Sequence, residues 1–533
     1  MIMAYNPKQI IEQGKAVLGI EFGSTRIKAV LIDPDFKPMA QGSHTWENQL
    51  VGGLWSYSVE SIWFGLQDCY QNLRQQVLEK YECEIENLAS IGVSAMMHGY
   101  MPFDKNGNIL VPFRTWRCTN TGKAAKELSD LFVFNVPLRW SISHLYQAIL
   151  DDEPHVKDID YLTTLAGFIH WQLTGRKVLG VGDASGMIPV DPATKSYNAE
   201  MVAKFDKLIA PKGYPWKLLD ILPESLDAGQ DAGQLTEAGA RKLDITGHLK
   251  PGAQICPPEG DAGTGMVATN AVRPRTGNVS AGTSSFSMIV LEKDLKQPHD
   301  VIDIVTTPDG SPVAMVHCNN CTSDLNAWVN LFKEYEEIMG MKVDMARIFT
   351  NLFNHALKGS KDCGGIMSFN YVSGEPVTGF ADGRPLFVRS AQDKFNLANF
   401  MRAIISGAIG VLKIGNDILF KEEKIKVDRI TGHGGLFTTP GVGQRILGAA
   451  LNSPISCMET AGEGGPWGMA ILAAYRINGA GQNLADYLDE KVFAGNTGTS
   501  VAPDPEDVEG FNAYIENYKR CLPIEAAAVE YKK

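Results

Sequence analysis

The sequence predicts an α/β protein made of two related domains. Its first hundred residues alternate between apolar runs of strand length and one long helical pattern, which is typical of α/β proteins. A turn rich in glycine and hydroxyl side chains joins two apolar runs at residues 22–25, and the same device returns at residues 281–284. Such an internal repeat predicts two similar domains. The length of 533 residues agrees, because single hydrophobic cores stop growing near about 250–300 residues.

The first elements follow from their side-chain patterns. Residues 16–20 and 27–32 are short apolar runs rich in β-branched side chains, and the turn between them predicts a β-hairpin. Residues 39–46 are expected to add a third strand. Apolar side chains recur at helical spacing in residues 58–79, which predicts a helix, and the apolar run at 88–95 predicts a buried strand.

The later elements are predicted in the same way. Residues 162–173 have a helical pattern, and a helix of small residues is expected over 264–271. Residues 277–290 predict a second hairpin, and residues 427–431 predict a short strand followed by a helix beyond Pro440. A last helix is expected near the C-terminus, at residues 510–531, after an acidic patch whose expected role is packing or capping.

The composition excludes several functional classes. A net charge of −12 argues against a broad nucleic-acid-binding face. We expect no membrane span, because no apolar run reaches about 18 residues, and no export signal, because residues 1–17 lack an apolar core. Nine scattered cysteines favour reduced thiols in the cytoplasm. The lone pair Cys318 and Cys321 is not expected to bind metal, because no second pair or suitably spaced histidine accompanies it.

The first turn has a chemistry that an ordinary hairpin does not need. Glu21 ends the entering strand, and Gly23, Ser24 and Thr25 follow it. Consecutive backbone amides in such a turn form a concavity suited to phosphate. A neighbouring carboxylate can hold a hydrated Mg²⁺ that spans the phosphates. The alternative is a plain Gly-Ser turn, and the hairpin alone does not decide between the two.

Two aspartates in the middle of the chain are candidate functional groups. Asp183 lies in a Gly-Asp-Ala-Ser-Gly segment, where a role in binding substrate and a structural role as a loop or cap residue both stay open. Asp261 precedes the small-residue helix, where aspartate is favoured as an N-cap. Because helix N-termini attract anions, an aspartate there would also stand close to a bound phosphate.

Three glycine-rich turns after strands are spread along the chain. The second contains Gly282, Thr283 and Ser284, and the third contains Gly434 and Gly435. One nucleotide held by both domains explains all three. Other nucleotide-binding motifs are absent from the sequence, which has no GxxxxGK[ST] phosphate loop and no dinucleotide-type GxGxxG order.

Seven short motifs identify a family resemblance. In chain order they are residues 21–25 (Glu-Phe-Gly-Ser-Thr), 97–99 (Met-His-Gly), 258–261 (Pro-Glu-Gly-Asp), 281–284 (Ala-Gly-Thr-Ser), 371–375 (Tyr-Val-Ser-Gly-Glu), 434–435 (Gly-Gly) and 465–470 (Gly-Pro-Trp-Gly-Met-Ala). Together they resemble the FGGY carbohydrate kinases of the actin/hexokinase/Hsp70-like superfamily. The resemblance implies two facing actin/hexokinase-like (ribonuclease H-like) domains with a nucleotide cleft between them. It also implies domains at 1–270 and 271–480, with a tail at 481–533 packed on the core.

The sequence departs from the family pattern at three places. Glu21 stands where the family has aspartate, so the carboxylate is one methylene further from the backbone. The segments at Trp55 and Trp116 lack the charged residues that follow these tryptophans in the family. Because both segments belong to the sugar pocket in the family, the preferred sugar stays open.

The resemblance implies a role for each candidate residue. It implies phosphoryl transfer from ATP to a terminal hydroxyl of an open-chain ketose, with Asp261 as the general base and Glu21 holding Mg²⁺. The implied sugar-binding residues are Met97, His98, Gly99, Asp183 and Asp261. The implied ATP-binding residues are Gly23, Ser24, Thr25, Gly282, Thr283, Ser284, Gly434, Gly435 and Gln444.

The preferred substrate by this resemblance is D-xylulose, with L-ribulose as the close alternative. Two hypotheses from other functional classes stay open: the protein could be a sugar- or nucleotide-binding regulator without turnover, or a chaperone-like ATPase of the same superfold. The partners expected are a small sugar, no nucleic acid and no membrane. Whether the chain forms a homodimer is left open.

Overall fold

The computed structural model describes residues 6–458, 464–479, 481–495 and 498–531, which cluster into two compact units. Unit 1 comprises residues 1–273, 304–313 and 463–494, and unit 2 comprises residues 274–303, 314–462 and 495–533. The chain first passes from unit 1 to unit 2 after residue 273, close to the domain boundary predicted at residue 270. The predicted domains differ in that α15 (Gly464–Asn478), expected in the second domain, lies in unit 1. The boundary predicted at residue 480 lies outside the described residues.

Unit 1 is built on a mixed sheet of six strands in the order β13-β6-β1-β2-β3, with β14 also paired to β6. The strand β1 pairs antiparallel with β2 and parallel with β6, and β6 pairs parallel with both β13 and β14. These strands are β1 (Val17–Phe22), β2 (Arg26–Ile32), β3 (Pro38–Thr45), β6 (Ser90–Ala95), β13 (Gln254–Ile255) and β14 (Glu259–Gly260). The predicted first hairpin and the following strands are thus confirmed.

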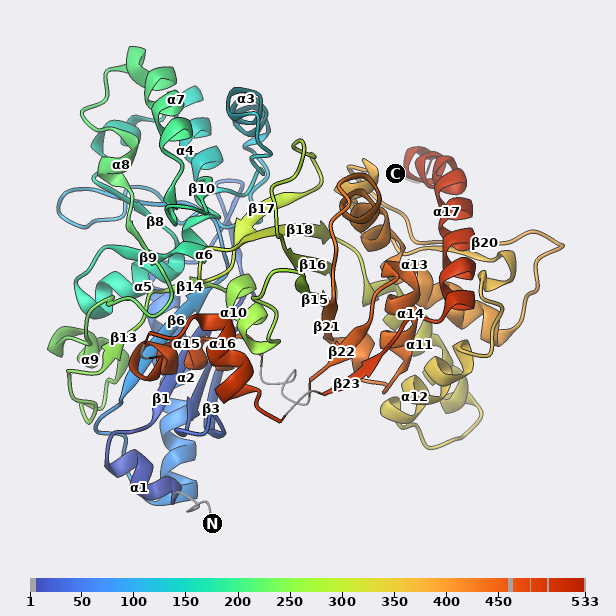
Figure 1. Cartoon of the computed structure of the whole chain (residues 1–533), viewed down its shortest axis with the longest axis horizontal. Coiled ribbons are helices and arrows are strands. Elements are labelled where there is room, and N and C mark those ends of the chain that lie inside the picture. The colour runs from blue at the N-terminus through green and yellow to red at the C-terminus, as the bar shows by residue number, and fades with distance from the viewer. Residues whose placement is uncertain (1–5, 459–463, 480, 496–497, 532–533) are drawn as a thin grey trace. The chain divides into compact units, whose positions relative to one another are not determined.

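Two helices from opposite ends of unit 1's sequence pack on this sheet. α2 (Val59–Tyr81), the helix predicted over residues 58–79, is capped by the Ser58 side chain and lies against β3. α15 lies against β1 and β6 (Figure 1). The approach to β1 is so close that a Cβ on Gly19 would meet the backbone oxygen of Pro466. This contact explains why α15, distant in sequence, belongs to unit 1.

The remaining elements of unit 1 surround this core. Its further helices are α1 (Pro7–Glu12), α3 (Gly122–Phe132), α4 (Ser141–Leu150), α5 (Leu165–Thr174), α6 (Val181–Ala184), α7 (Ala199–Ile209), α8 (Leu218–Ile221), α9 (Glu237–Leu243), α10 (Asp261–Ala268) and α16 (Leu484–Tyr487). Short two-stranded pairs are formed by β4 (Gln49–Val51) with β5 (Leu54–Ser56), β7 (Met101–Phe103) with β8 (Tyr161–Thr163), β9 (Val178–Gly180) with β12 (Glu224–Leu226), and β10 (Val190–Asp191) with β11 (Ser196–Tyr197).

Unit 2 repeats the sheet pattern of unit 1. Its strands run in the order β18-β16-β15-β21-β22-β23, where β15 pairs antiparallel with β16 and parallel with β21. They are β15 (Thr276–Ala281), β16 (Ser285–Val290), β18 (Pro312–Cys318), β21 (Arg429–His433), β22 (Ile455–Cys457) and β23 (Thr499–Val501). A further strand, β17 (Asp303–Thr306), pairs with β18, although most of its residues cluster with unit 1. The hairpin β15–β16 therefore corresponds to β1–β2, and β21 corresponds to β6. This correspondence confirms the internal repeat that the two turns predicted.

The helices of unit 2 include a long buried one, α13, that was not predicted from the sequence. They are α11 (Thr322–Ile338), α12 (Met345–Ala356), α13 (Leu397–Asp417), α14 (Val442–Leu451) and α17 (Pro505–Tyr531), with a short strand pair of β19 (Met367–Phe369) and β20 (Leu386–Val388). The stretch Leu397–Glu422 is long and apolar enough to cross a membrane, yet 78% of its apolar window is buried inside the protein, as in a core helix. Arg402 and Lys413 interrupt the run in sequence.

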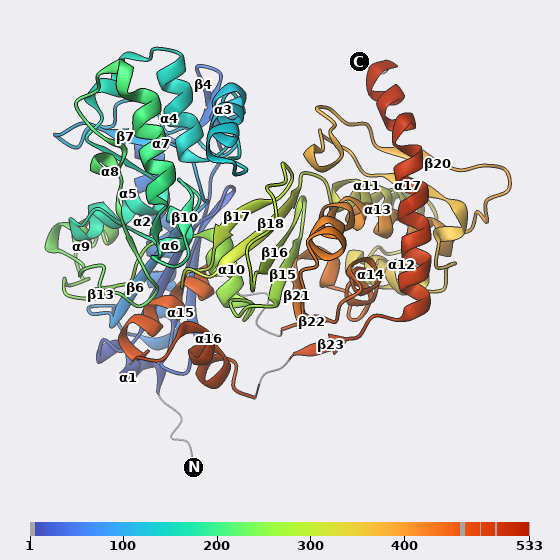
Figure 2. The same cartoon turned by 45° about the horizontal axis from the view of Figure 1, so that its top comes forward.

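The C-terminal helix α17 is fixed to unit 2 by a buried carboxylate. Asp507, fully buried, accepts a hydrogen bond of 2.7 Å from Arg402 and also pairs with Lys361 and Arg445. Burial raises the pKa of Asp507, but the three cationic partners outweigh burial and lower it to about 2. The acidic patch therefore has the packing role expected from the sequence. α17 runs beside α13 and α14 in both views (Figures 1 and 2).

Candidate functional site

The candidate residues of unit 1 gather at the carboxyl ends of three parallel strands. Phe22 of β1 and Gly260 of β14 both pair with Ala95 of β6, so the three strands end side by side. The chain beyond these ends carries the first turn after β1, the Met-His-Gly segment after β6, and Asp261 after β14. Ligands of α/β proteins bind at this edge of a sheet. The topology therefore brings together segments that are more than 200 residues apart in sequence.

Asp261 is the first residue of α10 and does not cap it. The N-cap is Gly260, and no side-chain cap is made, so the N-cap alternative for Asp261 is wrong. Its Oδ1 instead accepts a hydrogen bond of 3.3 Å from the backbone N–H of Met97. Burial raises the pKa of Asp261 to about 6, against the backbone hydrogen bonds that lower it. The Asp261 carboxylate thus connects the start of α10 to the Met-His-Gly segment.

Glu21 is a second buried carboxyl close to Asp261. Burial, together with the like charge of Asp261, raises the pKa of Glu21 to about 7, while Lys28 acts to lower it. The Glu21 carboxylate lies against the first turn of α15, where a Cβ built on Gly465 would overlap it. The longer side chain that departs from the family pattern is accommodated here by a glycine.

The first turn is held from outside by two aromatic residues. The indole N–H of Trp46 donates to the Gly23 carbonyl at 2.8 Å, and the Tyr57 hydroxyl donates to the Ser24 carbonyl at 2.6 Å. The two rings stack with centroids 4.0 Å apart. These two hydrogen bonds fix the carbonyls of Gly23 and Ser24 to neighbouring segments of unit 1. These supports were not predicted, since they come from segments outside the motif.

The Met-His-Gly segment leaves β6 in an unusual backbone conformation. His98 and Gly99 both have positive φ angles, of 71° and 87°. The Nδ1 atom of His98 lies 2.9 Å from the carbonyl oxygen of Gly186, to which it donates in the neutral ring. Met97 and His98 are both buried, at 7% and 5% exposure. Gly186 follows Asp183 closely, so this bond ties the segment to the Asp183 turn.

Asp183 lies in α6 with one oxygen bonded and the other without a partner. Its Oδ2 accepts from the Thr164 hydroxyl at 2.7 Å, whereas its buried Oδ1 has no hydrogen-bond partner. Burial raises the pKa of Asp183 to about 7, against the Thr164 hydrogen bond, and the charge of Asp261 adds to the rise. An unpartnered buried carboxylate oxygen is costly and rare in native structures. The role of Asp183 in binding substrate stays a prediction.

The raised pKa of Asp183 predicts how its replacement changes stability. Below about pH 4 the carboxyl is protonated in the folded and unfolded chains alike. As the pH rises, the unfolded chain loses this proton first, so folded stability falls until about pH 7. We expect Asp183→Asn to raise the free energy of unfolding at pH 8 by an amount of order 2–4 kcal/mol.

The measurement is urea unfolding of wild type and variant at pH 5 and pH 8, without ligands. The gain of Asp183→Asn at pH 8 should exceed its gain at pH 5. An equal effect at both pH values would show that the carboxyl ionises as readily in the folded chain as in water.

In unit 2 the second turn has the same form and its own supports. The Gly282 carbonyl accepts from the Thr322 hydroxyl at 2.7 Å, and the Thr283 carbonyl accepts from the Cys321 amide at 2.9 Å. The preceding Asn320 donates to the Glu375 carboxylate at 3.1 Å through its side chain. Burial raises the pKa of Glu375 to about 7, against these hydrogen bonds. The residues 371–375 thus support the turn at Ser284 indirectly.

The third turn lies next to the second within unit 2. Gly434 follows β21, has a φ of 98°, and lies so close to Ala281 that a Cβ would meet the Ala281 carbonyl. Gly435, by contrast, has open space where a Cβ would lie. Gln444 is buried, and its side-chain N–H groups donate to the backbone oxygens of Ile455 and Thr499. This observed contact of Gln444 is structural, and its ligand role stays a prediction.

The two segments that depart from the family pattern lie together. The guanidinium of Arg117 lies over the Trp55 ring, 4.1 Å from its centroid, and the Thr115 amide donates to the Trp55 carbonyl at 3.0 Å. The altered residues therefore form one continuous region, which adjoins the first turn through Tyr57.

The carboxylates near the first turn suit a hydrated Mg²⁺. Among the described residues, no three His, Cys, Asp or Glu side chains are placed to hold a metal ion together. Mg²⁺ keeps several waters and is usually bound by one or two carboxylates plus substrate phosphates. The pair of Glu21 and Asp261 fits that pattern, since each is buried and the charge of Asp261 raises the pKa of Glu21.

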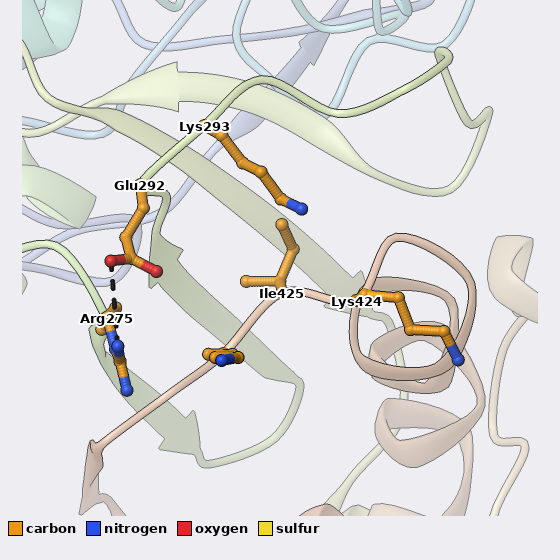
Figure 3. Close-up of a pocket in the computed structure, with 6 residues that line it drawn as sticks. Arg275, Glu292, Lys293, Lys424 and Ile425 are labelled. Carbon is orange, nitrogen blue, oxygen red and sulfur yellow. Dashed lines mark ion pairs between the residues drawn. The ribbon is translucent and has the colours of Figure 1, made fainter.

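A surface pocket of about 250 Å³ lies elsewhere in unit 2 (Figure 3). It is lined by Arg275, Glu292, Lys293, Lys424, Ile425 and Lys426. Arg275 pairs with Glu292 in the pocket wall, and none of the candidate residues lies in it. This pocket is distinct from the candidate site.

Comparison with known proteins gives matches over nearly the whole chain. Residues 16–247 match the N-terminal domain model of the FGGY family of carbohydrate kinases, and residues 277–477 match the C-terminal domain model. A xylulose kinase of Haemophilus influenzae is 22% identical over 94% of this chain and 98% of its own length.

Solved structures share the fold. A xylulose kinase and a gluconate kinase, both from Lactobacillus acidophilus, each superpose with a TM-score of 0.77 at 17% identity, covering 96% of this chain and 99% of theirs. At this identity the likeness establishes the two-domain fold and leaves the sugar open.

Proposed function

This chain belongs to the FGGY family of carbohydrate kinases, and we propose that it transfers the γ-phosphoryl group of ATP to a terminal hydroxyl of D-xylulose. The observation that supports this most is the position of Asp261 at the ends of the parallel strands, hydrogen-bonded to Met97 and electrostatically coupled to Glu21. Two relatives that match most of the chain are named xylulose kinases, which supports a ketopentose as substrate.

The proposed chemistry needs one base and a set of phosphate donors. The sugar oxygen attacks the γ-phosphorus, its O–P bond forms as the bond to the ADP oxygen breaks, and the hydroxyl proton passes to Asp261. A carboxyl with a pKa of about 6 is ionised at neutral pH and can accept this proton. Most of the rate enhancement in such transfers comes from alignment and charge stabilisation.

The other candidate residues have the following proposed roles. The amides and hydroxyls of Gly23, Ser24 and Thr25 in unit 1 and of Gly282, Thr283 and Ser284 in unit 2 hold the phosphates. Gly434 and Gly435 leave room for the adenosine, with Gln444 supporting that region. Glu21 holds Mg²⁺ through water, and the ion would neutralise phosphate charge. Met97, His98, Gly99 and Asp183 bind the sugar.

The test is ADP release by the purified protein with Mg²⁺ and ATP across a panel of sugars. The panel contains D-xylulose, L-ribulose, D-ribulose, glycerol and gluconate. We expect ADP release that depends on a ketopentose and is greatest with D-xylulose, and that is abolished in Asp261→Ala.

Each other outcome points to a different function. Release that is greatest with L-ribulose or gluconate would change the substrate. Sugar binding without ADP release would indicate a regulator, and release indifferent to every sugar would indicate an ATPase of another kind.

A further inference from the structure

The carboxyl group of Glu259 is buried in unit 1 and is unused by the chemistry above. The side chain has 1% exposure and lies beside the start of α6. Its Oε2 accepts from the amide of Asp183 at 3.0 Å, and its Oε1 accepts from the amide of Gly182 at 3.3 Å. One carboxyl therefore accepts hydrogen bonds from two successive amides at the start of the turn that carries Asp183.

The sequence of that turn fits the Glu259 carboxyl closely. A Cβ built on Gly180 would overlap Oε1 of Glu259, and a Cβ built on Gly182 would overlap Oε2. Neither glycine has a φ angle in the left-handed region. The conformational freedom of glycine therefore does not explain why glycine occurs at these two positions. They are explained by the space that the carboxyl occupies.

Glu259 also belongs to the backbone that carries Asp261. As a residue of β14 it pairs with Ser94 of β6, and Asp261 follows two residues later. The preceding carbonyl, of Pro258, accepts from the Gly180 amide at 2.8 Å. The residue is thus a rigid link between the segment of the proposed base and the turn that bears Asp183.

We propose that Glu259 is a positioning residue that holds α6 so that the unpartnered Oδ1 of Asp183 receives a sugar hydroxyl beside Asp261. The proposal rests on the proposed sugar-kinase function for its substrate and on the observed contacts for its geometry. It acts through Asp183, so its loss should weaken sugar binding more than ATP binding. A carboxyl that only stabilised the fold would leave both Michaelis constants unchanged.

The kinetic test compares Glu259→Ala and Glu259→Gln with wild type. Alanine leaves the two amides of α6 without an acceptor, and we expect the KM for D-xylulose to rise about tenfold or more while the KM for ATP stays within about twofold. Glutamine keeps one acceptor oxygen but sets an NH₂ group against the other amide, so its KM should lie between those of wild type and the alanine variant.

Asp244→Asn is the matched control. Asp244 is also buried in unit 1, and its carboxylate accepts from the amides of Thr246, His248 and Leu249, away from the site. We expect this variant to lose stability without a change in the KM for sugar. An unchanged sugar KM in both Glu259 variants, or an equal rise in Asp244→Asn, would overturn the proposal.

A second measurement separates this proposal from the proposed function. If wild type phosphorylates none of the sugars in the panel, the function is wrong, and backbone hydrogen exchange then decides the positioning role. We expect the amides of residues 181–186 to exchange at least tenfold faster in Glu259→Gln, with the rest of unit 1 unchanged. Exchange of that segment at the wild-type rate would reject Glu259 as its anchor.

Discussion

Asp261→Asn is expected to lower kcat by about 10²–10⁴-fold, the usual contribution of a general base. Asparagine has nearly the same shape and keeps an oxygen that accepts the Met97 amide hydrogen bond, so the site should stay folded. What it cannot do is accept the proton of the sugar hydroxyl. We therefore expect the KM for ATP to stay within about twofold, because the phosphate-binding turns are untouched.

The pH dependence of kcat/KM gives an independent measurement of the same role. In wild type, activity should rise with pH through the pKa of about 6 of Asp261. In Asp261→Asn the residual activity should lack this limb. The control is Asp244→Asn, which should keep both the rate and the limb. A decrease in kcat of less than about threefold, with the limb retained, would exclude Asp261 as the base.

The parts of the fold that the sequence predicted are those fixed by local patterns. Both hairpins, the helix after Ser58 and the C-terminal helix were predicted because alternation, helical spacing and turn chemistry act within a few residues. The long helix α13 was not predicted, because Arg402 and Lys413 interrupt its apolar pattern. Arg402 finds its carboxylate partner, Asp507, only in the folded protein, whereas Lys413 pairs with Asp417 one turn later in the same helix.

The contacts of the candidate site residues could not be predicted from the sequence. The N-cap assignment of Asp261 failed because Met97, from another strand, supplies the hydrogen bond. The contacts of Glu259 were not predicted, because its partners lie about 77 positions earlier in the chain. Placing α15 required the contact between Gly19 and Pro466, which no local pattern contains.

The second large effect expected is that of Gly465→Ala. The added Cβ would occupy the place of the Glu21 carboxylate, so either the carboxylate or the first turn of α15 must move. A displacement of about 1 Å at a catalytic site can cost about 10²-fold in rate, and we expect a decrease in kcat of that order. Overpacking of this kind should also lower the free energy of unfolding by about 1–3 kcal/mol.

A double-mutant cycle shows whether the Glu21 carboxylate is the cause. Removing it in Glu21→Ala opens the space that the new methyl group needs, because the next nearest atom, the Thr264 hydroxyl oxygen, lies 3.2 Å from the Cβ position. In that background Gly465→Ala should therefore cost less than about 0.5 kcal/mol, and the two changes should be strongly non-additive. Additive costs would mean that the methyl group collides with the helix backbone instead. Gly465 would then not be the residue that makes room for a glutamate, in place of aspartate, at position 21.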